Sequence, residues 1–266
     1  MTDRWRTIIH ISEHAPETGV RDTLKKISAE LVAKDACRGS ARGDVVIVVD
    51  VLRCTSAIVT ALANGAIDVK AVKTLSEARS LKSRNPTSIL AGERHGFPPR
   101  GFDIGNSPRE FTPDRVRDRR IIITTTSGTQ AINNASRARI VLIGSFLNVA
   151  AAAKTAWEIS VNTNSNLTVA MSGKQGSFSL EDMLCAGAII NRWDSKMVEY
   201  SDLACAALLA YRNASTDLLR HILVGNHAQE LVEAGFRDDV LFCTELDKWS
   251  IVPVLREGAI KILEKS

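Results

Sequence analysis

Short apolar runs alternate with amphipathic or alanine-rich stretches along most of the chain. The apolar runs are rich in β-branched residues and too short for helices, so each of them predicts a strand. These runs are Trp5–Ile11, Val45–Val49, Ile67–Val72, Ser88–Ala91, Arg120–Thr125, Arg139–Gly144 and Leu167–Ser172. The predicted helices are Val20–Ala36, Thr55–Asn64, Leu75–Arg84, Thr129–Ala135, Leu147–Trp157 and Ser179–Asn191. This alternation is typical of an α/β fold whose largely parallel sheet is covered on both faces.

The C-terminal quarter has a different pattern. Helical periodicity dominates from about Glu199, so we expect residues 199–266 to be mainly helical and to pack against the sheet. The sequence has no linker rich in Pro, Gly or Ser and no repeat of fixed period, which predicts a single domain over residues 1–266. The loosest junction is Arg38–Gly43, and residues 1–43 are therefore interpreted as an appended strand and helix.

Composition narrows the classes of partner. The chain carries 34 Lys and Arg against 30 Asp and Glu, a net charge of +4 that gives no reason to expect a nucleic acid. Five cysteines without a C-x-x-C pair argue against a disulfide framework and a zinc site, so we expect reduced thiols and a cytoplasmic location. Since no stretch reaches ~18 uninterrupted apolar residues, we expect no membrane role. A homodimer is compatible with the sequence.

Ligands of open parallel sheets bind beyond the carboxyl ends of the strands, so the polar residues after each strand are the first candidates for chemistry. The run Val45–Val49 leads into Asp50, and Arg53 follows before a predicted helix. An acid in this place can hold Mg²⁺ or attack phosphorus, and the arginine can neutralise an anionic oxygen. Alternatively, Asp50 caps the helix and Arg53 is its surface partner.

A second strand ends in hydroxyl groups and a glycine. Its last residues and the following turn are Thr125, Thr126, Ser127, Gly128 and Thr129. Side-chain hydroxyls and backbone N–H groups at the start of a helix favour an anion. An ordinary Ser or Thr cap with a glycine turn explains the same residues.

The third turn, after Leu167–Ser172, contains Lys174 between two glycines and places Ser179 three residues before Asp182. Lys174 or the loop amides can meet an anion, and Glu181 or Asp182 can help to hold a cation. Capping of the next helix by Ser179 and Asp182 is the alternative. A Walker A loop is excluded, because Gly173 is followed after four residues by Phe178.

The long loop Ala91–Phe111 gathers acids and arginines among glycines and prolines. Glu93 and Arg94 are its leading candidates, because mixed charges suit a site that binds a metal cation together with an anionic substrate. His95 beside them is equally well explained as a solvated neighbour.

Two familiar phosphate chemistries are excluded by spacing. A thiol phosphatase needs Arg six residues after its nucleophile, whereas Thr60 stands six residues after Cys54. Cys54 is therefore interpreted as a small buried residue at a helix start. An aspartyl-phosphate enzyme of the haloacid-dehalogenase type would place a second Asp where this chain has Leu52.

Taken together, these segments resemble the 2-phosphosulfolactate phosphatase family, the ComB-like proteins. The resemblance rests on the segments Asp50–Ala66, Gly92–Gly96, Gly101–Pro108, Thr124–Thr129, Gly176–Gly187, Gly235–Cys243 and Val252–Pro253. They occur in the same order over nearly the whole chain, and only about the first forty residues fall outside them. Cys54 stands where the family pattern has Ala, a change that is conservative in size.

The resemblance implies a three-layer α/β/α fold with a mixed, largely parallel sheet. It also implies Mg²⁺-dependent hydrolysis of 2-phospho-3-sulfolactate to 3-sulfolactate and phosphate, a step toward coenzyme M. Such a substrate carries phosphate, sulfonate and carboxylate groups, so its site needs several cations or N–H donors beside the metal. A phosphatase for another small phosphorylated acid, or a non-catalytic protein that binds an anionic metabolite, remains open.

We hypothesise metal-assisted hydrolysis of this small anionic substrate. Asp50, with Glu93 or Asp182, would hold Mg²⁺, and Arg53 and Arg94 would clamp the phosphoryl oxygens. The remaining donors to the substrate are Thr125, Thr126, Ser127, Gly128, Thr129 and Lys174. Either a metal-bound or carboxylate-activated water attacks phosphorus, or Asp50 itself is the nucleophile and forms an acyl-phosphate.

Overall fold

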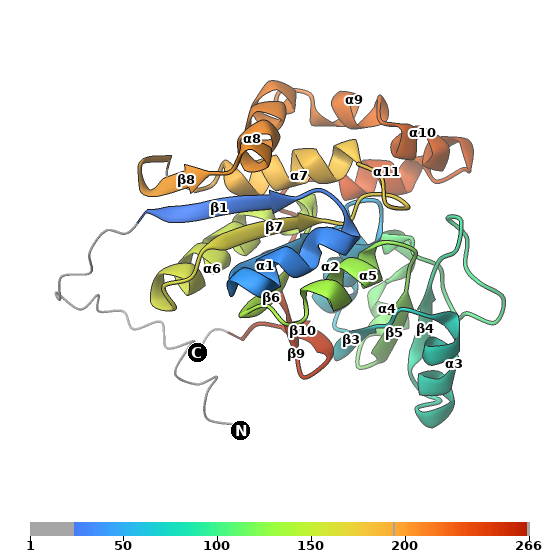
Figure 1. Cartoon of the computed structure of the whole chain (residues 1–266). Helices are drawn as coiled ribbons and strands as arrows, with labels where there is room; N and C mark the ends of the chain where they lie inside the picture. The colour runs from blue at the N-terminus through green and yellow to red at the C-terminus, as the bar shows by residue number, and fades with distance from the viewer. Residues whose placement is uncertain (1–23, 194, 265–266) are drawn as a thin grey trace.

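The computed structural model of the protein describes residues 24–193 and 195–264. In this part of the chain, ten strands form one sheet in the order β4-β5-β3-β10-β9-β6-β2-β7-β1-β8 (Figure 1). The strands are β1 (Lys25–Glu30), β2 (Val45–Val49), β3 (Asp68–Ala71), β4 (Ile89–Gly92), β5 (Arg120–Thr124), β6 (Ile140–Gly144), β7 (Leu167–Met171), β8 (Val198–Tyr200), β9 (Pro253–Arg256) and β10 (Ala259–Ile262). The predicted strand Trp5–Ile11 lies outside the described residues.

The α-helices connect and cover these strands. They are α1 (Cys37–Arg42), α2 (Cys54–Ala63), α3 (Leu75–Arg84), α4 (Pro113–Val116), α5 (Gly128–Ala135), α6 (Val149–Asn162), α7 (Leu180–Ile190), α8 (Asp202–Ala214), α9 (Leu218–Leu223), α10 (Asn226–Glu233) and α11 (Arg237–Cys243). Five of them, α2, α3, α5, α6 and α7, begin within two residues of a predicted helix, because the apolar periodicity that predicts them also determines which face packs on the sheet.

The sheet consists of two parallel blocks joined by an antiparallel hairpin. One block is β6-β2-β7-β1-β8 and the other is β4-β5-β3, and strands within each block are parallel. The hairpin β9–β10 lies between them and pairs antiparallel with β6 on one side and with β3 on the other. Each block therefore has its own set of strand carboxyl ends, and either set can contribute residues to a site.

Strand β2 shows why the sheet is covered on both faces. Val45, Ile47 and Val49 point into one core with residues of α6 and α7, whereas Val46 and Val48 point into a second core with residues of α2 and α5. All five side chains are fully buried, so the strand appears in the sequence as a continuous apolar run. The two cores flanking one mixed sheet confirm the predicted three-layer α/β/α fold.

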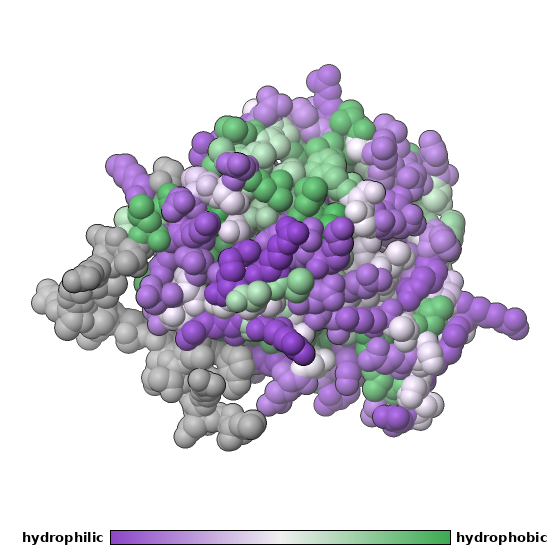
Figure 2. All heavy atoms as spheres, in the orientation of Figure 1, coloured by the Kyte–Doolittle hydropathy of each residue, from purple (hydrophilic) through white to green (hydrophobic). Residues whose placement is uncertain are grey.

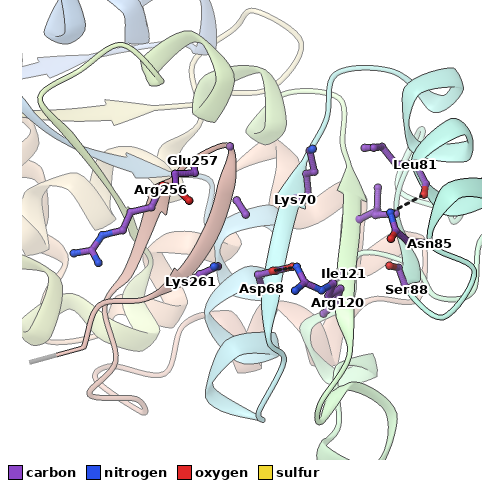
Figure 3. A pocket seen from close by; sticks show the side chains of 13 residues that line it. Asp68, Lys70, Leu81, Asn85, Ser88, Arg120, Ile121, Arg256, Glu257 and Lys261 are labelled. Carbon is purple, nitrogen blue, oxygen red and sulfur yellow. Dashed lines mark hydrogen bonds and ion pairs between the residues drawn. The ribbon is translucent and has the colours of Figure 1, made fainter. Parts of the chain in front are cut away.

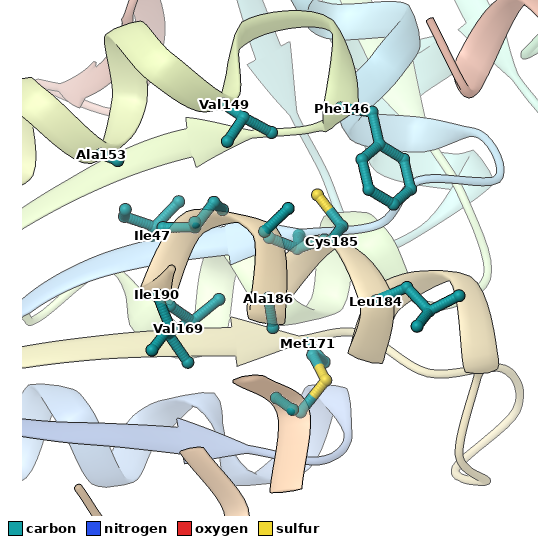
Figure 4. Close-up of a cluster of buried hydrophobic side chains, with 14 of the residues drawn as sticks. Ile47, Phe146, Val149, Ala153, Val169, Met171, Leu184, Cys185, Ala186 and Ile190 are labelled. Atoms are coloured by element: carbon teal, nitrogen blue, oxygen red, sulfur yellow. The ribbon is translucent and has the colours of Figure 1, made fainter. Parts of the chain in front are cut away.

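Helix α7 is buried along almost its whole length. Its residues Leu184, Cys185 and Ala186 pack among Phe146 and Met171 from the neighbouring elements (Figure 4). Helix α8 packs over α7, and the visible hydrophobic surface in Figure 2 gathers over these C-terminal helices. The first turn of α7 is thus held rigidly, which matters for the acids that it carries.

The predicted helix Val20–Ala36 is wrong within the described residues. Lys25–Glu30 forms β1, an interior strand that pairs with β7 and β8, and a short 3-10 helix occupies Ala33–Ala36. The KKISAE sequence has no strong strand signal of its own, so its pairing with two neighbours overrides local propensity. Residues 31–42 then lead through α1 into β2.

The C-terminal part is mainly helical, as the pattern predicts, with α8 to α11 in succession. The hairpin of β9 and β10, which was not predicted from the sequence, follows them. Its strands are only four residues each, too short to give a clear periodic signal. In the described ranges, no helix combines the length and apolar character needed to cross a membrane.

Candidate active site

A cleft of about 710 Å³ lies where turns from both blocks of the sheet meet. Its walls come from the turns after β2, β4, β5 and β7 and from the segment around the start of α10. Among the predicted site residues, its lining includes Asp50, Arg53, Glu93, Thr125, Thr126, Ser127 and Lys174. The structure therefore brings together four turns that are far apart in the sequence.

Besides α10, three α-helices that follow strands of the sheet begin at this cleft. Helices α2, α5 and α7 start directly after Arg53, Ser127 and Ser179, and all three of these residues line the cleft. The N-terminus of a helix carries unpaired N–H groups and the positive end of the helix dipole. Three such ends around one cavity favour a ligand with several negative charges.

Asp50 lies at the start of α2 and is buried. Its carboxylate Oδ1 accepts a hydrogen bond from the Cys54 N–H at 3.1 Å, so part of the predicted capping role is present. Burial raises the pKa of Asp50 to about 6, and the nearby negative charge of Glu93 acts in the same direction. Within the described residues, no cationic side chain forms an ion pair with this carboxylate. Asp50 is thus a buried acid without a full counter-charge.

Gly128 allows the start of α5 to approach Asp50 closely. A Cβ atom at this position would lie 2.4 Å from Oδ2 of Asp50 and 2.5 Å from the Cβ of Cys54. Cys54 is fully buried there, and burial raises the pKa of its thiol well above the ordinary value. These facts agree with its interpretation as a small structural residue rather than a thiolate nucleophile.

Asp182 does not cap α7, and its carboxylate joins two turns. Oδ1 accepts from the Val51 N–H at 2.8 Å, while Oδ2 accepts from the Gly173 N–H at 3.0 Å and from the Ser172 hydroxyl at 3.2 Å. The side chain of Ser179, the N-cap residue, makes no capping hydrogen bond. Burial, followed by the charge of Asp50, raises the pKa of Asp182. Asp182 thus fixes the turns after β2 and β7 relative to each other and is not among the residues that line the cleft.

Arg53 is buried and almost fully engaged by protein partners. It donates to Oδ2 of Asp239 and to the carbonyl oxygen of Gly96, both at 2.6 Å, and its guanidinium lies 4.2 Å from the ring centroid of Phe236. Asp239 also accepts from the Ser107 hydroxyl at 2.6 Å. Arg53 thus ties the long loop and α11 to the floor of the cleft.

Glu93 lines the cleft and organises two of its turns. Oε1 accepts from the Thr126 N–H at 2.7 Å, and Oε2 accepts from the Gly96 N–H at 3.0 Å. Each oxygen accepts a single hydrogen bond, so both retain lone pairs that can meet a cation. The acid therefore joins the loop after β4 to the threonine-rich turn.

Two predicted site residues are turned away from the cleft. The Arg94 guanidinium donates to the backbone carbonyl of Glu93 and to both Oγ1 and the carbonyl oxygen of Thr124. Thr129 exchanges hydrogen bonds with Thr125, as its Oγ1 accepts from the Thr125 N–H at 3.2 Å and its own N–H donates to Thr125 Oγ1 at 3.1 Å. These contacts shape the turn after β5, and Arg94 and Thr129 are not among the residues that line the cleft.

Sequence reasoning named Glu181 as a possible cation ligand but missed His227 and Glu230, which belong to α10. Glu181, buried in the first turn of α7, accepts from or shares a proton with Nδ1 of His227 at 2.7 Å. Lys174 forms an ion pair with Glu230 of α10, and burial lowers the pKa of Lys174. Because α10 lies some 45 residues after α7, no local spacing in the sequence connects these groups. Only the fold brings them to one cavity.

The cleft can offer a magnesium ion two carboxylates, with water as the remaining ligands. In the described part of the chain, no group of three or more His, Cys, Asp and Glu side chains is arranged to hold a metal. Mg²⁺ often binds one or two carboxylates and keeps several waters, so the donor pair Asp50 and Glu93 matches its needs. Asp50 supplies a buried carboxylate without an ion-pair partner among the described residues. Asp182 fits less well, because its two oxygens accept three protein hydrogen bonds and it does not line the cleft.

The chain was compared with known proteins. It matches the model of the 2-phosphosulpholactate phosphatase family over residues 31–258. A probable 2-phosphosulfolactate phosphatase of Pseudothermotoga lettingae is 40% identical over 213 residues, which cover 80% of this chain and 90% of that protein. A protein of the same description from Clostridium acetobutylicum is 36% identical over 238 residues, covering 88% and 99%. The span matched by the family model includes all the residues that line the cleft, from Asp50 to Ala234.

Proposed function

Since the chain belongs to the 2-phosphosulfolactate phosphatase family, we propose that it hydrolyses 2-phospho-3-sulfolactate to 3-sulfolactate and phosphate with the help of Mg²⁺. The observation that carries this proposal is the convergence of three helix N-termini and a buried, unpaired carboxylate on one cleft. Positive helix ends suit a substrate with phosphate, sulfonate and carboxylate groups, and the acids suit a divalent ion.

In this proposal the phosphoryl group lies near the start of α5. The turn that contains Thr126 and Ser127 offers hydroxyl and N–H donors to its oxygens. Lys174, in the turn after β7, adds a positive charge for a second anionic group of the substrate. Asp50 and Glu93 would hold Mg²⁺, which supplies charge neutralisation at the phosphoryl oxygens when it is bound.

The roles of the two arginines are revised by their contacts. Arg53 already donates to Asp239 and Gly96, so it supports the loop that carries the acids and offers only its remaining N–H groups to the substrate. Arg94 supports the end of β5 through Thr124. We therefore assign most of the anion binding to backbone N–H groups, with a contribution from Lys174, whose ion-pair partner Glu230 is largely exposed.

The proposed reaction is tested by measuring phosphate release with Mg²⁺ and with EDTA. The panel contains 2-phospho-3-sulfolactate, 2-phospholactate and 3-phosphoglycerate. We expect Mg²⁺-dependent release with the highest kcat/KM for the sulfonated substrate. Equal kcat/KM values for all three would point to a general phosphatase of small acids, and ligand binding without phosphate release from any of them would overturn the proposal.

The place of this reaction follows from the same proposal. Its product is a hydroxylated sulfonic acid, which we assign to the route toward coenzyme M implied by the family resemblance. Accumulation of 3-sulfolactate from phosphosulfolactate in a lysate, and its absence when the protein is removed, would test this assignment.

A further inference from the structure

We propose that His227 is the general acid that protonates the leaving oxygen of the substrate, and that Glu181 is the positioning residue that orients its ring. This inference rests on the proposed phosphatase function and adds a residue pair to it. The pair comes from α7 and α10, and both members line the cavity.

The contacts of His227 leave one ring nitrogen available to a ligand. Nδ1 lies 2.7 Å from Oε1 of Glu181, and the carboxylate requires the proton at this nitrogen. Nε2 forms no hydrogen bond with the described residues, and the side chain of His227 is 20% exposed at the cleft. An imidazolium held in this way presents its second N–H to the cavity.

Glu181 has the burial expected of a group that orients another. Its side chain is only 2% exposed, and its Oε2 atom is buried without a hydrogen-bond partner in the described residues. A buried carboxylate that holds one nitrogen of a histidine fixes both the tautomer and the ring orientation. Since α7 is packed along almost its whole length, this orientation is set by the core.

Other proton donors at the cleft are less suitable for this role. The Lys174 ammonium is paired with Glu230. His95 is exposed in the loop after β4, and none of the described contacts orients its ring. The His227 and Glu181 pair therefore combines a free N–H, a rigid support and a place in the cavity.

In the proposed step, water cleaves the phosphate ester while His227 protonates the leaving oxygen. The oxygen of water forms a bond to phosphorus while the bond between phosphorus and the ester oxygen breaks, and that electron pair stays on the ester oxygen. The ester oxygen takes the proton from Nε2 of His227 and becomes the hydroxyl of the product. Phosphate leaves as H₂PO₄⁻, which gives one proton to solvent, and His227 regains a proton from solvent.

The test compares substrates whose leaving groups differ in their need for a proton. The alkoxide that leaves from an alkyl ester such as 2-phospho-3-sulfolactate needs a proton. The 4-nitrophenolate that leaves from 4-nitrophenyl phosphate is stable without one. His227→Asn keeps a donor to Glu181 and removes Nε2. We expect its kcat to fall about 10²- to 10³-fold on the alkyl ester, and less than about 10-fold on the aryl ester.

The variants Glu181→Gln and His221→Asn complete the series. We expect Glu181→Gln to lower kcat on the alkyl ester about 10-fold, with the same dependence on the leaving group. His221→Asn is the matched control, because His221 lies on α9 with its ring against the Asp217 carbonyl and does not line the cleft. It should leave both rates unchanged, and the melting temperature of every variant should stay within a few degrees.

A second measurement uses the sulfonated substrate alone. The ¹⁸O isotope effect at the bridging oxygen should rise in His227→Asn, because the P–O bond then breaks without protonation. Equal losses of kcat on both esters and an unchanged isotope effect would overturn the inference. If the wild-type protein releases no phosphate from any ester, the proposed function itself is wrong, which is a distinct outcome.

Discussion

The cleft and a second hollow on the sheet contain similar charged residues in very different surroundings. The second hollow, a groove of about 310 Å³ beside β3, β5 and β10, holds the pair Asp68 and Arg120 (Figure 3). Their closest N and O atoms lie 2.5 Å apart, compared with 2.6 Å for Arg53 and Asp239. Arg120 is however 59% exposed, whereas Arg53 is 3% exposed.

Burial, rather than the number of charges, distinguishes the candidate site from the groove. Lys70 and Lys261 project into the groove and are both exposed, so water can stabilise them. Asp50, Arg53 and Glu181 of the cleft are buried, and Asp50 and Glu181 lack full partners among the described residues. A fold retains such costly groups where a ligand or a reaction uses them.

The largest effect is expected for Asp50→Asn. This change keeps the shape and the acceptor for the Cys54 N–H but removes the carboxylate charge, so kcat should fall at least about 10³-fold. Asp68→Asn in the groove is the matched control and should keep full activity. Phosphate release measures both, and thermal unfolding should show no loss of stability for Asp50→Asn. A large loss of stability with full specific activity would instead support the capping interpretation.

The next effect concerns the two ion pairs. Arg53→Met leaves the buried Asp239 without its cation, so the free energy of unfolding should fall by about 3 to 5 kcal/mol. Arg120→Met removes a cation that is 59% exposed and already screened by water, so it should cost less than Arg53→Met although its partner Asp68 is 5% exposed. Urea unfolding followed by circular dichroism measures both values. Similar losses for the two variants would contradict the distinction between buried and exposed charges.

A smaller effect depends on pH. The pKa of Asp50 rises from 3.8 to about 6 on folding because burial disfavours its charge, so the folded state binds the proton more tightly. The stability of the wild type should therefore fall, relative to Asp50→Asn, as the pH rises from about 4 to about 6, and the difference should then stay constant. The expected difference is on the order of 2 to 3 kcal/mol.

Urea unfolding in EDTA from pH 4 to pH 8 measures this difference. EDTA removes divalent ions that would otherwise stabilise the carboxylate. A difference that shrinks as the pH rises would show that Asp50 has a favourable partner in the folded protein.

The smallest effect is expected for Thr129→Ala. Its hydroxyl and that of Thr125 close the turn after β5, so the loss should cost about 1 kcal/mol of unfolding free energy. The activity should fall less than in Asp50→Asn, because Thr129 does not line the cleft. Steady-state kinetics and urea unfolding together check this order. A loss of activity as large as that of Asp50→Asn would place this hydroxyl on the substrate.

The fold was predictable where the sequence carries its own signal. The apolar run of β2 and the periodicity of α3 match the structure at both ends. Strand β1 and the hairpin of β9 and β10 lack such signals, because their pairing partners lie far away in the chain. Tertiary contacts determine the strand conformation of these segments, and a local sequence pattern does not contain those contacts.

Only the site residues that follow strands could be predicted from the sequence. Asp50, Glu93 and the turn at Thr125 follow strands, so the rule for parallel sheets pointed to them. His227 and Asp239 belong to short helices in the tail, where each appears as an ordinary surface residue in the sequence. Their roles follow from their contacts in the fold, since His227 contacts the buried Glu181 and Asp239 contacts the buried Arg53.

The position of the hairpin has a consequence for how the protein matures. Because residues 253–262 are inserted between β6 and β3, the two parallel blocks cannot join through paired strands until this late segment has been synthesised. During translation the two blocks would leave the ribosome unjoined, with the edges of β6 and β3 unpaired. A nascent chain stalled before Pro253 should therefore be a substrate for chaperones, and release of ten more residues should end that dependence.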